Sequence, residues 1–202
     1  MAAPTLAARA DRPFDFSLQM ERLVRDIVAR CPAFAHVDPG RMLFCISQAR
    51  NGSSIGTYAQ VVPLRFEGGR KVRRFGQWLY RMPSLRRGGR EVLYLVYFYL
   101  PRFQNAPFVH KLQIVFHELY HISPKFDGDV RRFPGRNFLH GPSEKAYDRI
   151  VTEIMETYLA LPGRNGCANF LHQSFDALER RYGEVVGYSV RNPAAYRVGR
   201  AP

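Results

Sequence analysis

The sequence predicts one α+β domain, in which a small antiparallel or mixed sheet of about three to four strands packs with several helices. Two observations predict it. Between residues 42 and 100, short runs rich in β-branched and aromatic residues alternate with turn residues. From residue 105 onward, apolar residues recur at helical spacing. We assign the domain to residues 14–185, between a flexible leader (1–13) and a tail (186–202).

The first predicted element is a helix from Phe16 to Cys31, because apolar residues repeat along this segment at helical spacing. Asp15 or Ser17 is suited to cap its start, and Pro32 ends it.

Three strands are expected after this helix, and the turns between them are marked by glycine. The strands cover residues 42–46, about 56–66, and 92–100, and a basic segment, 70–80, lies between the last two. Asn51-Gly52 is a strong signal for a tight turn after the first strand. Such short connections favour antiparallel pairing.

The second half of the domain is predicted to be helical. One helix begins near Asn105, its expected N-cap, and a second opens at Pro142 and closes at Pro162-Gly163. A third runs from about 168 to 182, and the tail beyond it shows no strong pattern. The expected buried stripe of the second helix is Tyr147, Ile150, Val151, Ile154, Met155 and Tyr158.

The formal net charge of +13 attracts polyanions, and most basic residues are arginines, which suit bidentate phosphate contacts. Nucleic acid, bound through an Arg-rich surface, is therefore one predicted partner. The clusters Arg70–Arg74 and Arg86–Arg90 fit either a surface for single-stranded nucleic acid or a solvated hairpin.

Three features predict a cytoplasmic protein with no membrane contact. The longest apolar run, Val92–Leu100, is far below the ~20 residues of a membrane-spanning helix. The first residues lack the apolar stretch of a secretory signal. Cys31, Cys45 and Cys167 are odd in number and lie far apart, which favours free thiols in a reducing compartment. The sequence leaves the oligomeric state open.

The helix that starts near residue 105 carries the run His117-Glu118-Leu119-Tyr120-His121. Residues four apart lie on one helix face, so His117 and His121 can direct two imidazole nitrogens at one Zn²⁺ ion. Glu118 projects about 100° further round the helix, where its carboxylate reaches a metal-activated water without ligating the ion. The run predicts a zinc hydrolase with Glu118 as general base, because without a metal these polar groups would be costly to bury.

A catalytic zinc of this type needs a third protein ligand and keeps one position open. The metzincin continuation is absent, since Pro124 and Asp127 stand where that group has Gly and His. We favour His140, just before the start of the next helix, as the third ligand. The carboxylates that stay open as alternatives are Asp127, Asp129, Glu144, Glu153 and Glu156.

The HExxH run, a Gly- and Arg-rich loop, and His140-Gly141-Pro142 together resemble the SprT-like metallopeptidases, and more closely the bacterial and phage-borne metallopeptidase domain. Phe126–Asp129 and Arg131–Arg136 are similar to the loop of the latter, and the resemblance spans about residues 42–161. It implies a zincin-like, SprT-like fold, Zn²⁺ as cofactor, Glu118 as base, and a polypeptide substrate. The ligands that it implies are His117, His121 and His140.

The cleft is expected between a sheet edge and the HExxH helix, where an extended polypeptide can add to the edge and be cut as by an endopeptidase. His110 is expected in the core or at the cleft edge rather than on the metal. Tyr120, Tyr158 and His172 are candidate oxyanion donors or plain core residues. Two other classes stay open: a non-peptidase zinc hydrolase, and a nucleic-acid-binding protein with a structural zinc.

Overall fold

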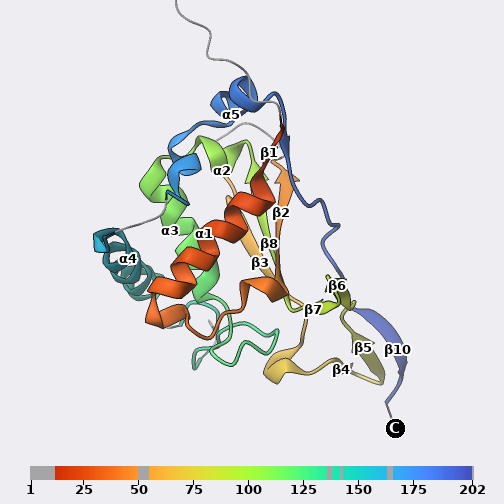
Figure 1. Ribbon diagram of the computed structural model, residues 1–202. Coiled ribbons are helices and arrows are strands. Elements are labelled where there is room, and N and C mark those ends of the chain that lie inside the picture. Colours follow the sequence, from red (N-terminus) through yellow and green to blue (C-terminus); the bar gives the residue numbers. More distant parts are fainter. Residues whose placement is uncertain (1–11, 50–54, 136–137, 142, 163–165, 202) are drawn as a thin grey trace, which may run out of the picture.

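A mixed three-stranded sheet lies at the centre of the α+β fold, and helices pack against it (Figure 1). The computed structural model describes residues 12–49, 55–135, 138–141, 143–162 and 166–201. None of the helices in these ranges has the length and apolar character needed to cross a membrane. Four predicted features lie outside the described residues: leader residues 1–11, the Asn51-Gly52 turn, and the helix boundaries at Pro142 and Gly163.

The central sheet has the order β2 (Met42–Gln48), β8 (Tyr94–Leu100), β3 (Ala59–Pro63). β8 pairs parallel to β2 and antiparallel to β3, so the expectation of purely antiparallel pairing is wrong and the mixed alternative is confirmed. The reason is topological. β2 and β3 run in opposite directions and β8 is inserted between them, so it must be parallel to one of the two. β3 is left as an edge strand of this sheet.

Alternate residues of β8 enter two apolar clusters, one on each face of the sheet. Tyr94 and Phe98 belong to the main core, which the helices cover, whereas Leu95 and Tyr97 belong to a smaller cluster on the opposite face. Burial on both faces explains why β8 is apolar throughout instead of alternating with polar residues.

Helix α1 (Phe16–Arg30) crosses the main core. Of the two predicted caps, Asp15 takes the role, because its Oδ1 accepts a hydrogen bond from the Leu18 N–H at 2.9 Å. Ser17 ties the helix to the sheet instead: its hydroxyl donates to the Phe44 carbonyl at 2.6 Å.

Helix α3 (Phe108–Tyr120) follows a short helix, α2 (Arg102–Asn105). The expected N-cap at Asn105 is wrong. Ala106 precedes a proline and is extended, which separates Asn105 from α3, and the Asn105 Oδ1 accepts from the Phe175 N–H at 2.8 Å. Pro107 occupies the N-cap position of α3.

Helix α4 (Glu144–Ala160) packs against α3 (Figure 1) and is capped by Ser143, which accepts from the Ala146 N–H. Most of its predicted stripe is buried, but Ile150 is 38% exposed and does not belong to it. The last predicted helix is two elements, η4 (Asn169–His172) and α5 (Phe175–Tyr182), because Gln173 is extended and Ser174 caps a new helix.

Two small sheets and a strand pair surround the centre. β6 and β7 form one hairpin, and β10 joins β4 and β5 in a second sheet, order β10-β5-β4, at the lower right of Figure 1. The sequence predicted no element at β10. The bounds are β1 (Phe14–Asp15), β9 (Val185–Val186), β4 (Val72–Phe75), β5 (Trp78–Arg81), β6 (Leu85–Arg87), β7 (Arg90–Val92), β10 (Tyr196–Arg200), and the 3₁₀ turns η1 (Pro32–Phe34), η2 (Pro39–Arg41) and η3 (Glu67–Gly69).

Candidate metal centre

The last turn of α3 and the loop before α4 bring three histidines together, and we call His117, His121 and His140 the histidine cluster. The Nε2 atoms of His117 and His121 are 3.0 Å apart, as the four-residue spacing on one helix face requires. The His140 ring lies 5.3 Å and 4.9 Å from their rings, measured between centroids. One nitrogen of each residue lies within 4.8 Å of the others.

The cluster fits a tetrahedral metal ion with one open position. Zn–N bonds of about 2.0–2.1 Å separate two tetrahedral ligand nitrogens by about 3.3 Å, and the 3.0 Å pair is close to that spacing. Among the described residues, this is the group of His, Cys, Asp and Glu side chains close enough to share an ion. Imidazole donors suit zinc, so the donor set agrees with the predicted cofactor.

The five carboxylate alternatives lie outside this group. The Asp129 carboxylate is engaged elsewhere, since it accepts hydrogen bonds from the Gly68 and Val130 N–H groups and from Arg132. Asp127 accepts from the Asp129 N–H. The Glu144 carboxylate is 73% exposed and lies 3.8 Å from His140 Nδ1. The remaining two, Glu153 and Glu156, are exposed on α4.

The loop that carries His140 is fastened to the end of α3. The Arg131 N–H donates to the His121 carbonyl at 2.6 Å, and the Arg131 Nε donates to the Tyr120 carbonyl at 2.7 Å. The Arg131 guanidinium also stacks on the Tyr120 ring at 4.1 Å. The buried Tyr94 hydroxyl accepts from the Gly128 N–H and donates to the Asp129 carbonyl. These bonds hold the chain in the turn that directs His140 back toward α3.

Residues in the first turns of α4 contact two of the histidines, His117 and His121. The Tyr147 hydroxyl donates to the His117 carbonyl at 3.3 Å, and its oxygen lies 3.1 Å from His121 Nδ1. If that hydroxyl hydrogen is donated to the His117 carbonyl, we infer that His121 Nδ1 carries the proton and that its Nε2 keeps the lone pair. Asp148 acts similarly on His117, whose Nδ1 lies 3.5 Å from the carboxylate. Both Nε2 atoms are thereby left as acceptors facing each other.

The electrostatics of the cluster favour the neutral form of His117 and His121, which is the form that binds a metal ion. Burial, followed by the nearby His117, His140 and Arg131, lowers the pKa of His121 to about 3. Burial and His140 also lower the pKa of His117, although Asp148 partly opposes this shift.

Glu118 lies beside the cluster and is only 8% exposed. Its Oε2 accepts a hydrogen bond from the Val61 N–H of edge strand β3 at 2.7 Å. Burial raises the pKa of this carboxyl to about 7, and the hydrogen bond from Val61 limits the rise. The carboxylate is therefore fixed by one oxygen to the sheet edge.

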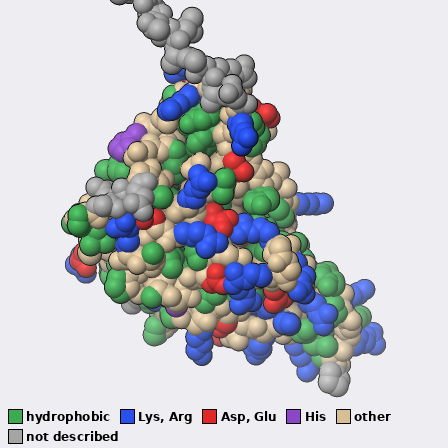
Figure 2. All heavy atoms as spheres, in the orientation of Figure 1, with side chains coloured by type: hydrophobic (Ala, Val, Ile, Leu, Met, Phe, Trp, Pro, Cys, Tyr) green, Lys and Arg blue, Asp and Glu red, His purple; other side chains and the backbone are tan. Residues whose placement is uncertain are grey.

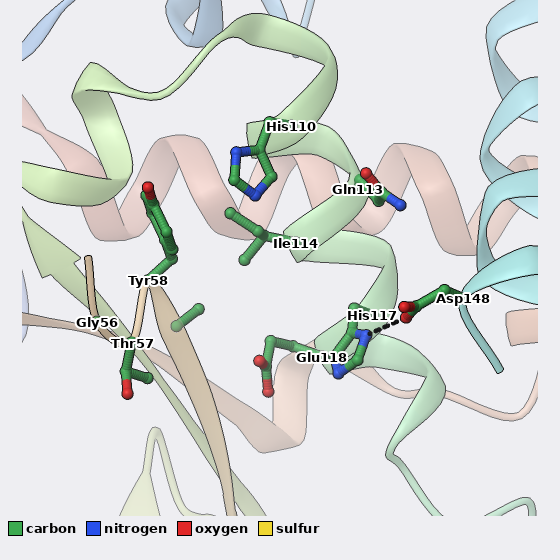
Figure 3. A pocket seen from close by; sticks show the side chains of 10 residues that line it. Gly56, Thr57, Tyr58, His110, Gln113, Ile114, His117, Glu118 and Asp148 are labelled. Atoms are coloured by element: carbon green, nitrogen blue, oxygen red, sulfur yellow. Dashed lines mark ion pairs between the residues drawn. The ribbon is translucent and has the colours of Figure 1, made fainter. Parts of the chain in front are cut away.

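Two hollows, of about 380 and 480 Å³, lie on either side of Glu118. Ala59, His117 and Glu118 line both, so the hollows form one cleft along β3. Figure 3 shows the first hollow, with Tyr58 and His110 among the side chains that line it and Asp148 paired with His117. His140 lines the second. The cleft thus lies between a sheet edge and α3, where it was expected.

Other residues that the sequence singled out have different roles. The Tyr158 hydroxyl donates to Asp26 at 2.7 Å, and the His172 ring stacks on Phe108 at 3.9 Å, so neither faces the cluster. His110 lines the cleft, its ring 4.9 Å from that of Tyr58, in agreement with its expected place.

Sequence reasoning missed Tyr147 and Asp148. Tyr147 was assigned to the buried stripe of α4, and it is indeed buried, but its hydroxyl serves the histidines. A weak signal existed, since both residues lie in the first turns of the helix that follows the third histidine.

The fold and the site define a class of protein: an α+β domain with a candidate three-histidine metal centre in a cleft beside a sheet edge. Residues 17–153, more than half of the chain, match the family described as "Putative phage metallopeptidase", and the chain belongs to this family. The match contains Glu118 and the histidine cluster. No curated protein and no solved structure shows significant similarity to the chain.

Proposed function

We propose that the protein is a zinc-dependent endopeptidase in which His117, His121 and His140 hold the ion and Glu118 is the general base. The convergence of three imidazoles beside a buried carboxylate, in a cleft open along a sheet edge, carries this proposal. Family membership supports a metal-dependent peptidase. The zincin-like arrangement, the SprT-like relationship and a cytoplasmic location belong to the same proposal.

The ion, when bound, supplies Lewis-acid chemistry: it polarises the substrate carbonyl and lowers the pKa of the attacking water. Glu118 moves the protons. Its Oε2 is held by the Val61 N–H, and among the described residues no donor is bonded to Oε1. Oε1 therefore accepts a proton from the water and returns it to the nitrogen of the leaving amine.

The substrate is proposed to be an extended polypeptide that pairs with β3. Alternate residues of β3 direct their main-chain N–H and C=O groups toward β8. The main-chain groups of Ala59, Val61 and Pro63 point away from β8, toward the open edge of the sheet. Since Glu118 occupies the Val61 N–H, the three outward carbonyls and the Ala59 N–H remain for a peptide. Main-chain pairing needs little side-chain specificity.

Glu118→Gln tests the mechanism in the zinc-loaded full chain. Release of labelled fragments from casein should fall by roughly 10²–10⁴-fold, because the amide cannot accept the proton, while one zinc ion per chain is retained. Glu153→Gln, the same change at an exposed residue of α4, is the matched control and should cleave normally. Cleavage that survives Glu118→Gln, or that resists a chelator, would contradict the proposal.

The structural-zinc alternative predicts a fourth protein ligand. Within the described residues, the group that could share an ion has three members, which favours a centre with an open position.

A further inference from the structure

The sheet formed by β10, β5 and β4 gathers arginines and aromatic rings on one face. Directly paired residues of an antiparallel sheet point to the same side. Tyr80 is paired with Arg73 on one side and Arg197 on the other, and Trp78 is paired with Phe75 and Arg200. The arginine–aromatic face therefore consists of two rows of three side chains: Arg73, Tyr80 and Arg197, then Phe75, Trp78 and Arg200.

Contacts within this face place the guanidinium groups over the rings. The Arg197 and Arg200 guanidinium carbons lie 4.3 Å and 5.0 Å from the centre of the Trp78 ring. The Arg73 guanidinium lies 4.6 Å from the Phe75 ring, which is itself 45% exposed. The face thus presents planar groups that combine positive charge with π surfaces.

Among the described residues, no carboxylate neutralises the arginines of this face. The strands β4, β5 and β10 contain no Asp or Glu. Within the part of the chain that the structure describes, no carboxylate pairs with Arg73, Arg197 or Arg200. Figure 2 shows Lys and Arg side chains gathered at this end of the molecule.

We propose that the arginine–aromatic face binds single-stranded nucleic acid. Arginines contact phosphates, and unpaired bases stack on aromatic rings and guanidinium planes, whereas a duplex keeps its base faces covered. Arg73 also lines the second hollow, so a strand bound here lies beside the cleft. The family match ends at residue 153, so β10, with two of the three arginines, lies beyond it.

The test is fluorescence anisotropy of the full chain with labelled dT20 and with a 20-base-pair duplex. Arg73→Gln combined with Arg197→Gln should weaken dT20 binding by about tenfold or more and lower the salt slope by roughly 1.4, the value for two lost phosphate contacts. The matched control, Arg74→Gln with Arg81→Gln, removes the same charge from the opposite face. It should change binding by less than about threefold at physiological salt, where charges beyond ~8 Å are screened.

Trp78→Ala removes the central ring and should weaken dT20 binding by roughly 5- to 150-fold, the range for one lost base stack. Because this change can also loosen the sheet, the arginine variants, which alter only exposed side chains, keep the test decisive. Equal loss in both arginine pairs, equal affinity for duplex and dT20, or binding to anionic vesicles but not to dT20 would each overturn the proposal. A preference for dT20 that is lost only with the Arg73 and Arg197 pair supports it.

Discussion

The histidine cluster and the arginine–aromatic face are both rich in polar groups, but the two regions differ in whether those groups have polar partners within the protein. At the cluster and beside it, three groups have internal partners: Tyr147 for His121, Asp148 for His117, and the Val61 N–H for Glu118. On the face, the guanidinium groups rest on aromatic rings, and no carboxylate among the described residues neutralises them.

This difference indicates what each region can bind. Pre-positioned imidazoles that are buried or partly buried suit a small ion with fixed geometry, because little reorganisation is needed when it arrives. Exposed cationic planes suit a long anionic chain that supplies its own charges and adapts to the surface. If this interpretation is correct, changes in one region should leave binding at the other intact.

The largest effect is expected from His140→Ala, because loss of a ligand should exceed the roughly 10–100-fold cost of losing an outer-shell partner. Zinc affinity, measured by competition with a chromogenic chelator, should fall more than 100-fold, and dT20 binding should be unchanged. His110→Ala is the matched control, since His110 lines the same cleft outside the cluster. Full zinc affinity in His140→Ala would show that another residue is the third ligand.

Tyr147→Phe should weaken zinc binding by about 10–100-fold, because it removes the oxygen that holds the Nδ1 proton of His121. Asp148→Asn should act in the same direction on His117. Tyr158→Phe is the control, because its hydroxyl bonds to Asp26 instead. The same chelator competition measures all three. Unchanged affinity in Tyr147→Phe would mean that the cluster is positioned without help from α4.

The sequence predicted the parts of this picture that rest on local patterns. The α+β class, the segments of β2, β8 and α3, and the Asp15 cap follow from periodicity and capping rules that act within a few residues. The four-residue spacing also predicted that His117 and His121 would face one point, and the structure places their Nε2 atoms together.

What could not be predicted depends on contacts between distant segments. The insertion of β8 between β2 and β3 is set by the whole chain path, and β10 is recognisable only beside β5, its partner from more than a hundred residues earlier. Tyr147 faces the histidines because α4 packs across α3, which no spacing rule encodes. In the sequence, five carboxylates were alternatives to His140 as the third metal ligand. Only the fold of the loop groups His140 with the other two histidines.

Asp129 links the two regions, because its carboxylate accepts from Gly68, just before β4, and from Arg132 in the loop of the site. Burial alone would raise the pKa of Asp129, but the hydrogen bonds from Arg132, Gly68 and Val130 bring it below the usual value. A lowered folded-state pKa adds stability above the unfolded-state value of about 3.9, and this stability is lost as the pH falls through the lower, folded value.

Asp129→Asn should therefore lower the free energy of unfolding by roughly 1–2 kcal/mol at pH 7, and by less at pH 3, which is below the unfolded-state pKa of about 3.9, so that the stability added by the lowered pKa is reduced there. Urea unfolding at the two pH values measures the difference. Asp127→Asn, a neighbour without an ion pair among the described residues, is the control. An equal loss at both pH values would show that the charge of Asp129 does not link the regions.

The smallest effect is expected at a third region, the β6–β7 hairpin, whose arginines resemble those of the face in sequence but not in surroundings. Arg87 pairs with Glu21 of α1 at 2.8 Å, and Arg90 pairs with Asp38. Arg87→Gln should cost up to about 1 kcal/mol of stability in urea unfolding and leave dT20 binding unchanged, because its charge already has an internal partner. Arg73→Gln should weaken dT20 binding and leave stability unchanged, because Arg73 lies on the arginine–aromatic face and pairs with no carboxylate among the described residues. If Arg87→Gln weakened dT20 binding as much as Arg73→Gln, net charge alone would explain the affinity, and the distinction between partnered and unpartnered arginines would fail.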